Sequence, residues 1–127
     1  MMTRDQFIRC YLTAVLFGEL CSDDEDEGEF LDNVYTIDDF SPEALERASA
    51  DCSAFLQAAE NAGIPLLYAD CAEQAAYDFY FTSRGHGTGF WDKPEVYGKQ
   101  DAEILNKIAE SFRCPEYYDA DGEIYCL

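Results

Sequence analysis

The chain has 127 residues, of which 48% are hydrophobic and 15% aromatic, so it is large enough to bury a core without disulfides or metals. Its 27 acidic residues outnumber 8 basic ones, and the resulting net charge of −19 repels DNA, RNA and anionic membranes. There is no N-terminal signal pattern and no apolar run near about twenty residues, which argues against secretion and membrane spanning. We therefore expect a single acidic globular domain, residues 1–127, located in the cytoplasm.

The first expected element is a helix from about Arg4 to Leu20. Thr3 followed by Gln6 three positions later is a capping-box pattern, which marks a helix N-terminus. The apolar residues behind it recur at helical spacing and form a wide stripe: Phe7, Ile8, Tyr11, Leu12, Val15, Leu16 and Leu20. A stripe of this width predicts that the helix lies at the centre of the core.

An acidic segment follows, and we expect residues 22–30 to form a mobile, solvated loop. No basic residue lies between Arg9 and Arg47. The segment carries six carboxylates, on Asp23, Asp24, Glu25, Asp26, Glu27 and Glu29. The loop either keeps the protein soluble or attracts a basic partner. Calcium chelation is a third interpretation, although the spacing of an EF-hand loop is absent.

A second helix is expected after an extended connection over residues 30–37. Ser41 is suited to the N-cap and Pro42 to the first helical position, where its missing N–H costs nothing. Gly63 and Pro65 end the helix. Its first turns add Glu43 and Glu46 to the acidic region.

The third helix is expected from Leu66 to Arg84, with Gly85 as the C-terminal glycine and Arg84 at the negative end of the helix dipole. A β-hairpin pairing residues 78–82 with 88–92 is the alternative. In both cases Phe90 and Trp91 should fold back beside Phe79 and Phe81.

The C-terminal part predicts a turn at residues 93–95, a fourth helix from Gln100 to Phe112 and a hairpin pairing residues 116–118 with 123–125. Because a two-stranded hairpin is marginal alone, it should dock on the helices, beside the aromatic residues of 79–91. Cys114 and Cys126 flank it; we expect reduced thiols, with a disulfide between them as the alternative. The fold class is therefore mainly α (α+β): about four helices in a compact bundle, a glycine-rich loop and a short C-terminal hairpin.

Residues 78–92 contain the only histidine and the only tryptophan of the chain. His86 could act as a general base oriented by Asp78 or Asp92. Alternatively, Arg84, Trp91, Phe90 and Tyr80 could line a small-ligand pocket in which Arg84 holds an anion. The glycine spacing matches neither a dinucleotide-binding turn nor a phosphate-binding loop, and no second histidine is present. We expect no catalysis, no metal and no cofactor.

The same stretch, Asp78-Phe79-Tyr80-x-Thr82-x-Arg84-Gly85-His86-Gly87-x-Gly89-Phe90-Trp91-Asp92, resembles a segment of short, uncharacterised bacteriophage and prophage proteins. Those proteins also close with a segment similar to Tyr118-Asp119-Ala120-Asp121-Gly122-Glu123-Ile124-Tyr125. The similarity covers about a third of the chain, and Tyr80 replaces a tryptophan. It implies a phage-derived protein inside a host cell and no particular mechanism.

Acidity and resemblance together favour an interaction protein that blocks a basic, nucleic-acid-binding surface of a host protein, for example one used in defence or in nucleic-acid processing. Its carboxylates would replace phosphates, without direct contact to nucleic acid or membrane. The alternatives are a small-ligand binding module that uses Arg84, His86, Trp91 and Asp92, a structural role, and an enzyme based on His86.

Overall fold

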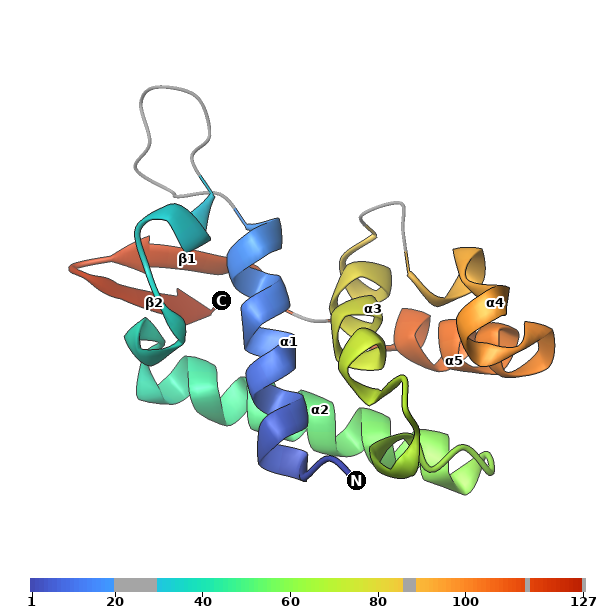
Figure 1. Ribbon diagram of the computed structural model, residues 1–127. Coiled ribbons are helices and arrows are strands. Elements are labelled where there is room, and N and C mark those ends of the chain that lie inside the picture. The colour runs from blue at the N-terminus through green and yellow to red at the C-terminus, as the bar shows by residue number, and fades with distance from the viewer. Residues whose placement is uncertain (20–29, 86–88, 114, 127) are drawn as a thin grey trace.

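The computed structural model describes residues 1–19, 30–85, 89–113 and 115–126. Helices dominate these residues, and a two-stranded antiparallel sheet follows them at the C-terminal end (Figure 1). The predicted fold class is therefore confirmed. The helices and strands are α1 (Arg4–Gly18), α2 (Pro42–Asn61), α3 (Ala72–Arg84), α4 (Pro94–Tyr97), α5 (Lys99–Ser111), β1 (Tyr117–Ala120) and β2 (Glu123–Cys126).

Three of the predicted helix ends are confirmed in their chemistry. The Thr3 side chain accepts from the Gln6 N–H while the Gln6 side chain accepts from the Thr3 N–H, so the capping box of α1 is complete. Ser41 caps α2 ahead of Pro42. At the end of α3, Gly85 takes the left-handed conformation with φ 70°, which glycine adopts without strain.

Several elements differ from the predictions in their bounds or their type. The structure ends α1 at Gly18, with Glu19 extended, and starts α3 at Ala72, because the preceding residues form a single 3-10 turn, Leu66–Tyr68. The connection expected to be extended contains two 3-10 turns, Leu31–Asn33 and Ile37–Asp39. The expected turn at 93–95 is the start of α4. The alternative strand at 78–82 is wrong, because these residues are helical.

The core is built around α1, which packs on both α2 and α3. Aromatic rings join the helices: Phe55 of α2 stacks on Phe79 of α3 with centroids 4.2 Å apart, and Phe90 lies 5.8 Å from Phe55. Phe90 therefore folds back into the core as expected. Trp91 does not, since its side chain is 60% exposed. In the single 3-10 turn Phe90–Asp92, adjacent side chains point in different directions, and only one of the two can enter the core.

The hairpin docks at the start of α2 rather than beside residues 79–91. The Ser41 N–H donates to the Ile124 carbonyl at 2.8 Å, Phe40 and Ile124 form a parallel bridge, and the ring of Phe40 meets that of Tyr117 edge to face. Figure 1 shows the hairpin and the α4–α5 pair at opposite ends of the molecule. The backbone groups beside Phe40 dock the hairpin, and their location could not be derived from apolar spacing. Among the described residues, no helix is long and apolar enough to cross a membrane.

Candidate functional site

The acidic surface predicted from the sequence is described only in part. Asp23, Asp24, Glu25, Asp26, Glu27 and Glu29 lie outside the described residues. Glu43 and Glu46 lie on the first turns of α2, and both are exposed. This is the outward face of the helix, because Ala44 and Ala48 occupy the inward face and are fully buried.

The hairpin brings further carboxylates to the start of α2. The Tyr125 hydroxyl donates to the Glu123 carboxylate at 3.2 Å. The pKa of Tyr125 is raised, first by this hydrogen bond and the charge of Glu123, and further by the charges of Asp121 and Glu43. Two carboxylates of the hairpin and one of α2 therefore raise the pKa of the same phenol. Asp121 and Glu123 were not among the predicted partner-binding residues, because the docking position of the hairpin follows from tertiary contacts.

In the described part of the chain, four acidic side chains form ion pairs. Across the described ranges, ion pairs join three basic side chains to four carboxylates: Arg47 to Asp51, Arg84 to Glu19, and Lys93 to both Asp78 and Asp92. None of these pairs involves Glu43 or Glu46. The net charge of −19 already counts every basic residue, so it persists whichever ion pairs form, and it generates a negative field around the molecule.

Arg84 belongs to a partly buried network of hydrogen bonds with Glu19 and Tyr80. Its Nε donates to Glu19 Oε2 at 3.0 Å, and the Tyr80 hydroxyl donates to the same oxygen. Burial, the hydrogen bond to Glu19 and the charge of Glu19 all raise the pKa of Tyr80. The network fastens the end of α1 to α3, so its role here is structural.

His86 lies outside the described residues, and the two carboxylates considered as its partners both have hydrogen-bond partners within them. Asp78 is fully buried and accepts from Lys93 Nζ at 2.9 Å, Tyr97 Oη at 2.6 Å and Gln74 Nε2 at 3.1 Å. Asp92 accepts from the Gly89 N–H at 3.1 Å. Among the described residues, no group of three or more ligating side chains could hold a metal ion. Cys114 is also outside this part, and Cys126 is a free thiol.

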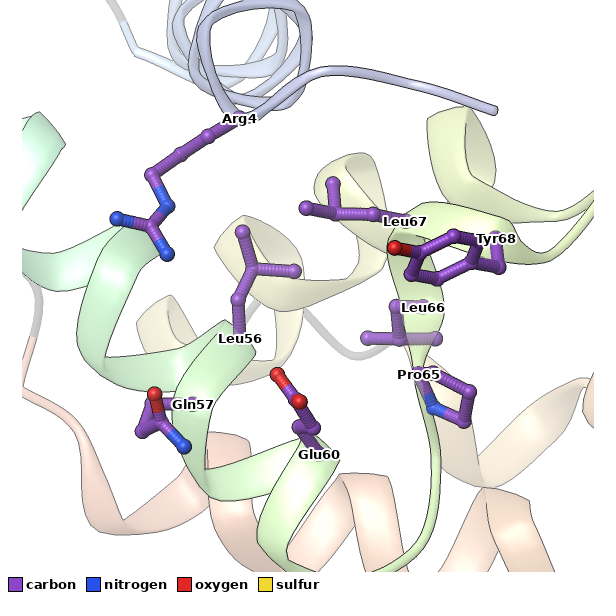
Figure 2. Close-up of a pocket in the computed structure, with 8 residues that line it drawn as sticks. All are labelled: Arg4, Leu56, Gln57, Glu60, Pro65, Leu66, Leu67 and Tyr68. Carbon is purple, nitrogen blue, oxygen red and sulfur yellow. The ribbon is translucent and has the colours of Figure 1, made fainter.

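A hollow between α1, α2 and the turn Leu66–Tyr68 is too small for a ligand. Figure 2 shows Arg4, Leu56, Glu60 and Tyr68 around it, with the Arg4 guanidinium extending from α1 toward α2. Its volume is about 40 Å³. Ligand pockets commonly reach several hundred Å³, so this hollow is a packing irregularity at a three-way junction.

A larger groove runs along the outer face of α5 beneath Trp91. Its volume is about 500 Å³, and nearly buried Ala102 contributes to its wall. Trp91 and Pro94 belong to the preceding segment, while the charged and amide side chains of the groove come from α5: Lys99, Glu103, Asn106, Lys107 and Glu110. We call this hollow the Trp91 groove. Of the predicted loop-site residues that the structure describes (Arg84, Trp91 and Asp92), only Trp91 lines it.

Sequence reasoning missed this groove, although one signal was available. Asparagine is a poor helix former, and Asn106 stands in mid-helix between the buried positions Ala102 and Ala109. A polar residue at such a position calls for a reason beyond packing. Comparisons with protein-family models, with curated proteins and with solved structures found no match.

Proposed function

We propose that this chain is a small acidic interaction protein of bacteriophage type, acting in the host cytoplasm. It inhibits a basic host protein by offering carboxylates where that protein otherwise binds nucleic-acid phosphates. The observation that carries the proposal is the net charge of −19, in which all 8 basic residues are already counted, so internal ion pairs do not reduce it. A field of this sign draws basic surfaces toward the protein and repels nucleic acid itself.

The exposed start of α2 is the described part of the proposed contact surface. Glu43 and Glu46 project from it, and Asp121 and Glu123 of the hairpin lie nearby. Arginine and lysine side chains that bind phosphate also pair with carboxylates, because both groups present negatively charged oxygens. The acidic residues of 23–29 carry the same negative charge, and we include them in the proposed contact surface on the basis of the sequence only.

The test is capture of host proteins on the immobilised chain at about 50 mM and about 300 mM salt. Contacts dominated by charge weaken as the Debye length shortens, so we expect a nucleic-acid-binding protein to be retained only at low salt. Added duplex DNA should release it. The double variant Glu43→Gln/Glu46→Gln should reduce retention several-fold.

Its matched control is Glu60→Gln/Asp70→Asn, which removes the same charge from exposed positions away from the start of α2. Glu60 lies 17 residues beyond Glu43 on the same helix, a distance of about 25 Å. Equal losses in the two variants would leave only a non-specific charge effect. If retention of the host protein changed neither with salt nor on addition of DNA, the proposal would be contradicted.

A further inference from the structure

The Trp91 groove combines a flat aromatic wall with carboxylate and amide groups. Its volume of about 500 Å³ lies within the range of ligand-binding pockets. The Trp91 side chain is 60% exposed, although it is the largest apolar side chain of the protein. An indole held in this way leaves a ring face free to stack with a planar or cationic group.

Asn106 supplies a hydrogen-bond acceptor that has no donor. Its Oδ1 is shielded from solvent and is, within the described residues, the single buried side-chain oxygen or nitrogen without a hydrogen-bond partner. No hydrogen bond within the described residues therefore holds the amide oxygen in its present orientation. A ligand that carries N–H groups would give this oxygen a donor once the amide turned toward the groove, and would relieve the cost of an unsatisfied acceptor.

The charges of the groove and of the whole protein select a cation. Lys99 and Lys107 balance Glu103 and Glu110, so the lining has no net charge of its own. The surrounding charge of −19 then decides the sign, because it attracts cations and repels anions. Both lysines are exposed, and their long stems allow the ammonium groups to move away into solvent.

We propose that the Trp91 groove binds an arginine side chain of a basic partner protein. The guanidinium stacks on the indole of Trp91, donates to Asn106 Oδ1, and is flanked by the carboxylates of Glu103 and Glu110. Guanidinium is planar, weakly hydrated and rich in N–H donors, which fits an aromatic wall beside acceptors better than ammonium does. That the arginine belongs to a basic partner protein rests on the proposed function. That the groove binds a guanidinium group does not depend on it.

The only tryptophan of the chain makes the test direct, because intrinsic tryptophan fluorescence reports on this groove alone. The full chain is titrated with three short peptides of one sequence that contain arginine, lysine or citrulline. Citrulline keeps the planar shape and most N–H groups but lacks the charge. We expect a saturable change with the arginine peptide, weaker binding of the lysine peptide and none of the citrulline peptide. Equal responses to all three would overturn the proposal.

Substitutions in the groove give changes of opposite sign for a cation and an anion. Asn106→Asp adds a carboxylate and should tighten the arginine peptide by about tenfold, while Asn106→Leu should abolish its binding. Lys107→Gln should tighten it several-fold. The control Gln100→Glu adds the same charge to an exposed position of α5 outside the groove lining and should have little effect. Weaker binding of the arginine peptide by Asn106→Asp would overturn the proposal.

The two proposals fail separately. In one outcome, Glu43→Gln/Glu46→Gln loses the captured host protein, Asn106→Leu still retains it, and the arginine peptide does not change the tryptophan fluorescence. The groove proposal is then wrong and the proposed function stands. If the arginine peptide binds and no basic host protein is retained, the groove chemistry stands and the proposed function is wrong. Thermal unfolding of each variant shows that it is folded.

Discussion

Asp78 is the residue whose environment most constrains the segment after α3. Its carboxylate is fully buried, and Lys93, Tyr97 and Gln74 each donate to it. Lys93 directly precedes the short helix α4 and Tyr97 is its last residue, so the carboxylate fastens that segment to α3. A buried charge is stable only while its partners remain, because desolvation of an unpaired ion is costly.

Replacing Lys93 by methionine should therefore destabilise the protein by about 3 kcal/mol, measured by urea unfolding. The same change at Lys99 or Lys107, both exposed, should cost less than about 0.5 kcal/mol. Adding Asp78→Asn to Lys93→Met should recover part of the loss, because the unpaired charge is then removed. Equal losses for all three lysines would show that the buried pair contributes no specific stability.

Tyr80 and Tyr97 should make the protein sensitive to alkali. Burial, together with hydrogen bonds to Glu19 and Asp78 respectively, raises the pKa of both phenols above the ordinary value of about 10. Below pH about 10 both phenols are protonated in the folded and the unfolded chain, so their contribution to stability is fully present. Above that pH the unfolded chain loses the protons first, and the free energy of unfolding should fall as the pH rises.

The measurement is the free energy of unfolding between pH about 8 and pH about 11. Tyr97→Phe removes one of the two protons whose release upon unfolding causes the decline, so the free energy of unfolding should fall less steeply with pH. The variant should also be less stable at every pH, because Asp78 loses a hydrogen-bond donor. Tyr68→Phe, at a strongly exposed position, serves as the control. An unchanged slope in Tyr97→Phe would contradict the assignment.

The contact between α1 and α3 depends on one residue without a side chain. A Cβ at Gly18 would lie 2.5 Å from Tyr80 Cε2 and 2.9 Å from its hydroxyl. Tyr80 has little freedom to withdraw, because Glu19 accepts from its hydroxyl and Tyr11 packs edge to face on its ring at 5.9 Å.

Gly18→Ala should consequently destabilise the protein by about 1–3 kcal/mol, although alanine normally favours a helix over glycine by about 1 kcal/mol. Thermal unfolding provides the comparison, with Ser49→Ala in α2 as a helical control expected to be near neutral. A stabilised Gly18→Ala variant would mean that the helices separate easily and that their close approach is not required.

Local signals predicted elements wherever the chemistry of an element is contained in a few neighbouring residues. The Thr3–Gln6 capping box, the Ser41–Pro42 start and Gly85 all belong to this class. The start of α3 was predicted too early because Leu67 continues the apolar spacing of the helix. The Leu67 carbonyl instead accepts a hydrogen bond from the Met2 N–H at 2.9 Å. This is a tertiary contact, and neighbouring residues give no signal of it.

For the candidate sites, the sequence indicated which residues to consider, but it did not predict their positions in the fold equally well. Glu43 and Glu46 were assigned to the acidic region, and both are exposed on α2. Trp91 was singled out but assigned to the core, since composition alone cannot tell which neighbour in a tight turn points inward. The groove beneath it depends on the packing of α5, and no sequence pattern spans both parts.

At the scale of the whole molecule, a charge of −19 on 127 residues also acts on the fold itself. Like charges repel more strongly in the compact state than in the expanded chain, so the folded protein carries an electrostatic cost that salt reduces. The internal ion pairs are partly or fully buried on at least one side and are screened less. The repulsive contribution should therefore dominate the salt dependence.

We expect the free energy of unfolding in urea to rise by about 1 kcal/mol between about 0.05 M and about 0.5 M sodium chloride, as the Debye length falls from roughly 14 Å to roughly 4 Å. Glu43→Gln/Glu46→Gln should show a smaller rise, because two of the repelling charges are gone. Guanidinium chloride would screen the charges while unfolding the chain, so urea is the denaturant to use. A stability that falls with salt would mean that attractive pairs outweigh repulsion. Repulsion among the acidic side chains would then be a minor contribution to stability, although the net charge of −19 that attracts a basic partner would be unchanged.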